Sequence, residues 1–233
     1  MALLSLEVWV SHCRSFLDLC GDARKRPEDP FMGGLRCVQK PQYAYRQGVP
    51  GTKGRLLVAT PLLNDPNFER TVILMLEDNE DGALGLVLNR PSPLEVGEPL
   101  PDWADLSATP PVVFVGGPVS RSSVIALARC SEGPDISEET WTSVLGPIGV
   151  LDLTADAALL HATVGDVRVF AGYAGWDAEQ LRAEIAEGAW FVVDADPDDA
   201  TTDEPDGLWR RVLRRQRNPL CLFANYPDDI SAN

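Results

Sequence analysis

An arginine at the end of a predicted strand is the first candidate for chemistry. In ALGLVLNRP, residues 83–91, strand alternation places Arg90 on the same face as three leucines. A guanidinium beside an apolar row needs a partner of opposite charge. The acidic side chains on preceding segments that could supply it are Asp65, Glu69 and Glu77. Without such a partner, the guanidinium could receive a carboxylate or phosphate from a ligand, so a structural role and a ligand-binding role both stay open.

A glycine-rich stretch before a predicted helix is the second candidate. FAGYAGWDAEQLRAEIAEGAW, residues 170–190, places an aromatic-glycine run directly before a helix start, and helix N-termini often bind phosphates. Asp177 and Gln180, however, have the spacing of a capping box, in which side chains satisfy the first helical N–H groups. Gly188 stands where a left-handed residue ends a helix. We therefore predict a structural corner here and no phosphate site.

Motifs for metals and activated nucleophiles are missing from the sequence. EDNEDG, residues 77–82, resembles part of a calcium loop, but Leu88 occupies the position of the closing glutamate. The aspartate-rich segment 194–206 also lacks that pattern, which favours a solvated loop. The only histidines are His12 and His161, and no HExxH, GxSxG or P-loop motif occurs. The sequence thus predicts no metal, no cofactor and no catalytic residue.

The basic run WRRVLRRQR, residues 209–217, contrasts with the acidic chain around it. The sequence has 20 Lys and Arg against 35 Asp and Glu, a formal net charge of −15, which repels nucleic acid and anionic lipid headgroups. On a helix, the run forms a cationic stripe of Arg210, Arg211, Arg214 and Arg215. We predict that this stripe pairs with the acidic loop that precedes it. Neither direct binding of nucleic acid nor a membrane partner is expected.

Several short strands and helices must position these residues. The predicted strands cover residues 54–61, 71–76, 83–91, 111–117, 122–130, 166–175 and 190–196. The predicted helices cover residues 155–164, 177–188 and 207–217. The second strand is apolar throughout, as in strands buried on both faces, and the second and third form a hairpin. The fourth and fifth are interpreted as another strand pair. The predicted fold class is α+β, with a twisted mixed, largely antiparallel sheet and flanking helices.

Composition divides the chain into an extension, one domain and a tail. Residues 1–53 are comparatively basic and rich in turn formers, which predicts a mostly disordered extension. Whether translation starts at Met1 or Met32 stays open. A single domain is expected at 54–225, followed by a tail at 226–233. The five scattered cysteines contain no CxxC motif, and the N-terminus has no signal-peptide pattern. A cytoplasmic protein is therefore expected.

Three stretches, taken in order, resemble the AlgH/YqgE family of small bacterial cytoplasmic proteins. They are GRLLVATPLLNDPNFERTVILMLEDNEDGALGLVLNRP at 54–91, FVGGPV at 114–119 and the stretch at 170–190 quoted above. The resemblance implies an α+β fold whose twisted sheet is bent toward a pseudo-barrel. It also implies a ligand-binding cleft near Asp65, Phe68, Thr71, Asn89, Arg90, Gly116, Gly117, Pro118 and Trp176.

Proteins of this family are commonly labelled transcriptional regulators, but no helix-turn-helix is recognisable in the sequence. We therefore expect a non-enzymatic binding or regulatory protein that acts through a protein or small-anion partner. The alternative is an enzyme that acts on a small anionic metabolite in a cleft near Arg90. A ligand that only stabilises the protein would favour the first hypothesis, and a ligand that is turned over would favour the second.

Overall fold

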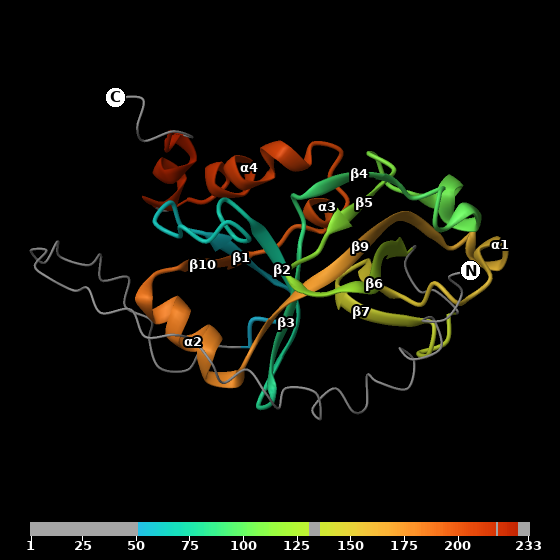
Figure 1. Ribbon diagram of the computed structural model, residues 1–233, viewed down its shortest axis with the longest axis horizontal. Helices are drawn as coiled ribbons and strands as arrows, with labels where there is room; N and C mark the ends of the chain where they lie inside the picture. The colour runs from blue at the N-terminus through green and yellow to red at the C-terminus, as the bar shows by residue number, and fades with distance from the viewer. Residues whose placement is uncertain (1–50, 131–135, 218, 228–233) are drawn as a thin grey trace, which may run out of the picture. The chain divides into compact units, whose positions relative to one another are not determined.

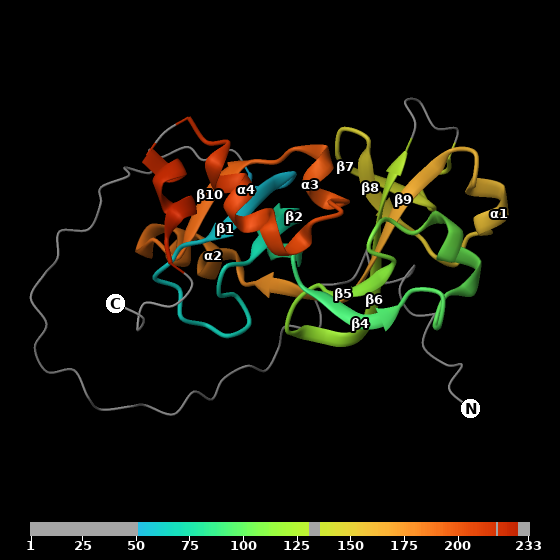
Figure 2. The same cartoon turned by 90° about the horizontal axis from the view of Figure 1, so that it is seen from above.

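The computed structural model describes residues 51–130, 136–217 and 219–227, which are coloured in Figures 1 and 2. The predicted extension lies outside the described residues apart from its last three positions, and so does most of the predicted tail. Thr52 is buried, and its main-chain N–H and its hydroxyl donate to one carboxylate oxygen of Asp78, at 2.7 and 2.8 Å. The folded contacts therefore begin within the last residues assigned to the extension.

Four antiparallel strands form one half of the sheet. They are β1 (Arg55–Ala59), β2 (Val72–Asn79), β3 (Gly82–Val87) and β10 (Trp190–Asp194). The strands β2 and β3 form the predicted hairpin, and β1 lies between β2 and β10. Residues 72–76 are all buried without alternation. This confirms that the strand is covered on both faces.

The long strand β9 (Val164–Trp176) joins this half to the other and crosses the centre of Figure 1. The remaining strands are β4 (Pro91–Glu95), β5 (Val112–Val115), β6 (Val119–Cys130), β7 (Trp141–Leu145) and β8 (Ile148–Leu151). The predicted pairing of the fourth strand with the fifth is wrong. Both β5 and β6 pair with β9, the first parallel and the second antiparallel, because the chain crosses β9 between them.

The sheet curls into a half-barrel with mostly antiparallel pairing. The end strand β7 approaches the residue before β1, since a Cβ added to Gly54 would lie 3.0 Å from the carbonyl oxygen of Val144. Gly54 has a φ of 73°, a left-handed conformation that glycine adopts without strain. The predicted α+β class and the bend of the sheet toward a barrel are confirmed.

Short helices cover the sheet. The α-helices are α1 (Ala157–Leu160), α2 (Ala178–Glu187), α3 (Pro197–Ala200) and α4 (Leu208–Arg214). The 3-10 helices are η3 (Pro101–Leu106), η4 (Pro205–Gly207) and η5 (Pro219–Asn225). In α4, Trp209 Nε1 donates to the carbonyl of Ala59 at 2.9 Å, which anchors this helix on β1. Within the described ranges, no helix is long and apolar enough to cross a membrane.

Helix α2 lies where the sequence predicts it, but its first turn differs from the prediction. Asp177 is the N-cap residue, yet its side chain accepts no capping hydrogen bond. Gln180 instead donates to Glu184 Oε1 at 2.9 Å. The predicted capping box is therefore wrong, because Gln180 binds an acidic residue one turn further along the helix. Gly188 ends the helix with a φ of 84°, as predicted.

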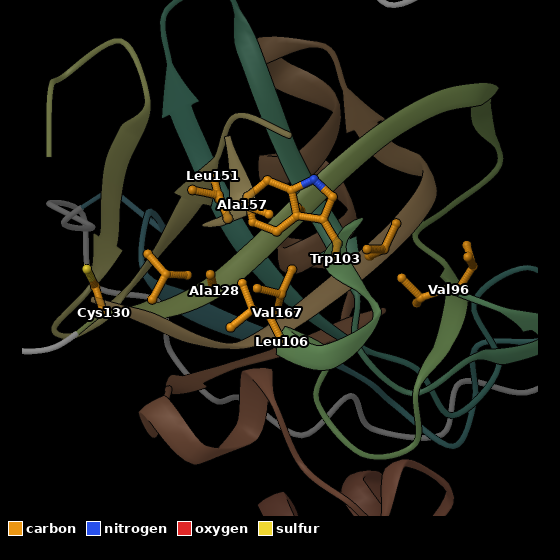
Figure 3. Packing of buried hydrophobic residues seen from close by; sticks show 12 residues of the cluster. Val96, Trp103, Leu106, Ala128, Cys130, Leu151, Ala157 and Val167 are labelled. Carbon is orange, nitrogen blue, oxygen red and sulfur yellow. The ribbon is translucent and has the colours of Figure 1, made fainter. Parts of the chain in front are cut away.

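Two clusters of buried apolar residues lie on different parts of the sheet within the described residues, and further buried residues such as Phe114, Phe170 and Trp209 belong to neither of them. The cluster in Figure 3 lies over β6, β8 and β9 and includes Trp103 and Leu106 from η3. The other cluster lies between the first strands and α2 and includes Trp176, Leu181 and Trp190. The helix η3 thus covers one part of the sheet, and α2 covers another.

Candidate functional site

The loop before β2 carries three of the predicted cleft residues. Asp65 Oδ1 accepts a hydrogen bond from the main-chain N–H of Asn67 at 2.8 Å, a side-chain turn typical of aspartate. The N–H of Phe68 donates to the carbonyl of Asp65 at 2.9 Å. Thr71 is buried, and its hydroxyl donates to the carbonyl of Phe68 at 2.8 Å. Asp65 and Thr71 therefore shape this loop through contacts with its own backbone.

Asn89, after β3, holds the same loop from the opposite side. Its Oδ1 accepts a hydrogen bond from the N–H of Val72, and its Nδ2 donates to the carbonyl of Arg70, both at 2.9 Å. Only 7% of Asn89 is exposed. The side-chain amide of Asn89 thus bonds to the backbone on both sides of Thr71, as a neighbouring strand would. Both polar atoms of this side chain are therefore engaged within the protein.

Arg90 is half-buried beside this loop, and its Nη2 donates to the main-chain carbonyl of Glu69 at 2.5 Å. No ion pair joins it to Asp65, Glu69 or Glu77 within the described part of the chain. The expected carboxylate pairing is therefore wrong. A carbonyl oxygen replaces the acid because the loop brings its backbone, and not a side chain, against the guanidinium. A guanidinium has five N–H donors, so this bond leaves donors for another acceptor.

The predicted glycines lie where the chain crosses β9. The N–H of Gly116 donates to the carbonyl of Ala171, and its own carbonyl accepts from Val87, both at 2.9 Å. A Cβ on Gly116 would lie 2.3 Å from the Gly172 carbonyl oxygen, and one on Gly117 would lie 2.2 Å from the Tyr173 backbone. Pro118 follows directly and leads into β6. These positions therefore require glycine because two backbones touch here.

An aromatic cluster completes the predicted set. The ring centroids of Phe68 and Trp176 are 6.2 Å apart, and Trp190 lies 5.6 Å from Phe68. Glu184 Oε2 accepts hydrogen bonds from both indole nitrogens at 2.9 Å. These contacts join α2 to β9 and β10. The structure thus places the predicted residues along the loop, the end of β3, the β9 crossing and this cluster, mainly in contacts with the protein itself.

A separate open depression of about 740 Å³ lies on another part of the domain. We call it the charged depression, and none of the predicted cleft residues lines it. Its lining comes from β6, β9, the segment from the N-cap of α3 to the C-cap of α4, and Thr109 between η3 and β5. The lining residues are Thr109, Arg129, Asp166, Asp196, Asp198, Asp199, Thr201, Thr202, Asp203, Arg211 and Arg215.

One wall of the charged depression carries exposed ion pairs. Arg129 on β6 lies 2.7 Å from Asp198 and 3.2 Å from Asp166, measured between guanidinium nitrogen and carboxylate oxygen. The two carboxylate side chains are 84% and 55% exposed. Exposed ion pairs contribute little to stability. A ligand can therefore exchange with these partners at small energetic cost.

An ion pair between a buried carboxylate and a partly exposed arginine fixes another wall. Asp199 in α3 has a side chain only 3% exposed and accepts two hydrogen bonds from Arg215, at 2.7 and 2.5 Å. It also accepts from the N–H of Asp196 at 2.9 Å, which completes a capping box at the start of α3. The predicted solvated loop at 194–206 is confirmed in part: six of its seven acidic residues are exposed, but the segment forms α3 and η4, and capping and Arg215 hold the Asp199 carboxylate inside. The predicted pairing of the basic stripe with the acidic segment is confirmed for Arg211 and Arg215, whereas Arg210 donates to the carbonyls of Ala224 and Tyr226 instead.

A buried cation lies directly behind the depression. Arg168 in β9 is 1% exposed and donates to the carbonyls of Thr202 and Thr109, at 2.8 and 2.6 Å. Its guanidinium carbon lies 4.3 Å from the centre of the Phe114 ring. Burial lowers the pKa of Arg168 to about 10, although Asp166 and Asp203 oppose the shift. Arg168 thus stays charged at neutral pH and ties two lining segments to the sheet.

These groups can bind charged and polar parts of a ligand. Carboxylates and guanidiniums attract charges of opposite sign, and threonine hydroxyls both donate and accept hydrogen bonds. No group of His, Cys, Asp and Glu in the described ranges is arranged to hold a metal ion. The exposed pairs at Arg129 are exchangeable, whereas Asp199 and Arg168 keep the walls in place. The arrangement therefore provides a firm frame with exchangeable charges on its surface.

No pattern in the sequence predicts the charged depression. Its residues come from segments far apart in the chain, and the acidic segment that forms much of it has the composition of a loop. One signal was present: Arg168 interrupts an otherwise apolar run in the strand VRVFAG, residues 167–172. A charge at such a position needs polar partners nearby.

Comparison with known proteins identifies the family. Residues 56–220 match the family model described as AlgH-like. A UPF0301 protein of Streptomyces coelicolor is 52% identical over 187 residues, which cover 79% of this chain and 97% of that protein. A UPF0301 protein of Thermobifida fusca is 46% identical over 190 residues, which cover 77% of this chain and 94% of that protein.

Solved structures agree with this match. The crystal structure of a Corynebacterium diphtheriae protein has a TM-score of 0.72 at 32% identity, covering 77% of this chain and 94% of that one. The solution structure of the AlgH protein from Pseudomonas aeruginosa has a TM-score of 0.56 at 30% identity, covering 79% of this chain and 99% of that one. From its sequence match and its fold, this chain belongs to the AlgH-like family.

Proposed function

We propose that this protein is a non-catalytic binding protein whose charged depression receives the cationic groups of a ligand. The observation that carries the proposal is the depression itself, an open volume of about 740 Å³ lined by five aspartates, three arginines and three threonines. Its carboxylates outnumber its guanidiniums. Arg129, Arg211 and Arg215 are each engaged by side chains of the same lining. The local charge therefore favours a cation.

The charge of the whole chain supports the same ligand class. A formal net charge of −15 attracts cations from solution and repels anions. Asp203 lines the depression and is exposed. Asp196 is also exposed, and one oxygen of its carboxylate caps α3. Both carboxylates are positioned to meet ammonium or guanidinium groups.

Spermidine is a suitable probe because it carries several ammonium groups and can be compared directly with inorganic phosphate. At ten times its Kd, a ligand that binds only the folded state should raise the Tm by about 4 °C. We expect this shift with spermidine in the full chain and a much smaller shift in Asp203→Asn. Glu187→Gln removes an exposed carboxylate at the end of α2 and serves as the matched control. Mass spectrometry should show spermidine unchanged after incubation.

Two results would contradict the proposal. If Glu187→Gln lost as much of the spermidine shift as Asp203→Asn, the effect would reflect overall charge and not the charged depression. If spermidine gave no shift at low ionic strength, the depression would not bind cations. Raised salt should weaken the shift, since binding relies on charge.

A second candidate function is supported by the unused donors of Arg90. This half-buried guanidinium bonds to the Glu69 carbonyl through Nη2 and can bind an anion through its other nitrogens. On this alternative, the protein is an enzyme or a sensor for a small anionic metabolite. A Tm rise with phosphate that is lost in Arg90→Met but kept in Arg121→Met would favour it. Conversion of a bound anionic metabolite would favour the enzyme over the sensor.

A regulatory role through ligands or protein partners is compatible with this proposal, but direct binding of nucleic acid is not part of it. The chain is acidic, and Arg211 of α4 and Arg215 at its C-cap are engaged by Thr202 and Asp199. We place the protein in the cytoplasm on the basis of its scattered cysteines. Duplex DNA bound tightly and selectively at physiological salt would contradict this part of the proposal.

A further inference from the structure

An apolar surface lies along β9 on a different part of the domain from the charged depression. Val115, Val119 and Val124 are 39%, 36% and 43% exposed. They are three of the seven large apolar side chains exposed among the described residues. All three pair with β9, either directly opposite Ala171 or opposite Tyr173. We call this surface the β9 outer face.

The strand register places these residues in adjacent rows. Val115 on β5 and Val124 on β6 are both opposite Ala171, so the three form one row across the sheet. Directly opposed residues share a face of the sheet, and so do residues two apart along a strand. Residues 171, 173 and 175 of β9 are partly or fully exposed, whereas 170, 172, 174 and 176 are buried. The exposed rows therefore follow one face of β9.

The same face is covered further along the strand. Val167 and Val169 belong to the same buried cluster as Trp103 and Leu106 of η3, and Figure 3 shows Val167 beside Leu106. Ala171 packs at the border of that cluster. Sheets bury an apolar face by packing a second layer against it. On this face the second layer covers Val167 and Val169 of β9. It leaves Val115, Val119 and Val124 exposed.

Negative charge lies at the far end of the β9 outer face. Leu84 on β3 is opposite Gly175 and also opposite Glu77 on β2, so this row ends in a carboxylate. Glu77 is exposed. Asp177, just after β9, is also exposed, and its side chain makes no capping bond to α2. An apolar strip that ends in acids is complementary to a segment with apolar residues and a basic end.

We propose that the β9 outer face binds an amphipathic helix of a protein partner, with lysine or arginine at the end that meets Glu77 and Asp177. The helix would continue the layer that η3 begins and would bury the three exposed valines. Helices that bind grooves and faces in this way present apolar residues at spacings of three and four. The acidic end sets the direction of the helix, and the net charge of the chain favours a basic partner. This inference is independent of ligand binding in the charged depression.

An 18-residue helical peptide of leucine and lysine, with the lysines concentrated toward one end, tests the proposal against an equivalent leucine and glutamate peptide. NMR spectra of the full chain should show amide shifts in β9 residues 171–175 and in residues 115–124 with the lysine peptide only. Val124→Lys should weaken binding at least tenfold. Leu159→Lys changes a residue that is 78% exposed on α1 and should leave binding unchanged. Both variants are at exposed positions, and circular dichroism checks that they fold.

Glu77→Gln combined with Asp177→Asn should weaken binding several-fold and reduce its dependence on salt. The proposal is overturned if the glutamate peptide binds equally well, or if Leu159→Lys weakens binding as much as Val124→Lys. Shifts confined to residues 196–203 would place the cationic peptide in the charged depression and would also overturn it. Self-association that Val124→Lys abolishes, measured by sedimentation, would show that a second copy of the chain occupies the face instead.

Discussion

The loop around Thr71 and the charged depression use polar side chains in opposite ways. In the loop, Asn89 and Thr71 are buried, and their polar atoms bind the backbone on either side of them. In the depression, Arg129 and Asp198 meet each other at the surface, where solvent reaches both. The first arrangement fixes a backbone conformation, whereas the second holds charges that a ligand can displace.

The stretches that carry the family resemblance therefore contribute strongly to the fold. Gly116 and Gly117 permit the contact between two backbones at β9, and Trp176 packs in the core. The residues most suited to bind charge lie instead in a segment whose composition indicates only an acidic loop. Substitutions in the two regions should thus differ in their cost to stability. The ion pair between the buried Asp199 carboxylate and Arg215, within the depression, should be the exception.

The largest effect on stability is expected at the ion pair between Asp199 and Arg215. Arg215→Met leaves the Asp199 carboxylate buried without its bidentate partner and should lower the free energy of unfolding by about 3 kcal/mol. Urea unfolding followed by circular dichroism measures the change. Arg214→Met, at an exposed neighbouring position, is the control and should change stability by less than about 0.5 kcal/mol. Equal losses in both variants would show that this ion pair does not hold the wall.

A smaller but clear loss is expected in the loop. Asn89→Leu keeps the approximate side-chain volume but leaves the Val72 N–H and the Arg70 carbonyl without the amide, and should cost about 2 kcal/mol. Hydrogen exchange at the Val72 amide should become faster, which locates the effect. The exposed Asn64→Leu serves as the control. An unchanged unfolding midpoint for Asn89→Leu would remove the contrast between the two regions.

The smallest effect is expected at the exposed ion pairs. Arg129→Met breaks its contacts with Asp166 and Asp198 and should lower stability by less than about 0.5 kcal/mol. Thermal unfolding at low and high salt measures it, and any loss should shrink as salt rises. A loss well above 1 kcal/mol would mean that Arg129 is part of the structural frame and is not exchangeable.

Local sequence patterns predict much of this fold. The strand at residues 55–59, the hairpin of β2 and β3, and the helix α2 each have an apolar pattern or a turn signal within one short window. The α+β class follows from their mixture, and the family resemblance adds the curled sheet. These features depend on neighbouring residues in the chain, which is the information that periodicity contains.

The partners across the sheet are not local, and the predictions fail there. Whether β5 pairs with β6 or with β9 depends on the backbone contact at Gly117, for which no pattern of apolar residues is diagnostic. The same holds for the charged depression, where Asp199 meets Arg215 only after α3 and α4 have packed on the sheet. For a similar reason, Arg90 donates to the main-chain carbonyl of Glu69 and not to one of the acidic side chains that were expected. A charged residue in an apolar stretch of sequence predicts that a polar partner lies nearby, but the sequence does not identify that partner.

The pairings of β9 and β10 also determine when the sheet can assemble during synthesis. β9 pairs with β3, β5 and β6, which all leave the ribosome before it, and β10 pairs with β1, the first strand of the sheet. Pairings between distant segments form slowly, because a long loop must close before any contact is made. The early strands therefore wait with unpaired edges until the chain is nearly complete. Such edges are where nascent chains aggregate, so this fold depends on protection during translation more than a domain with local contacts does.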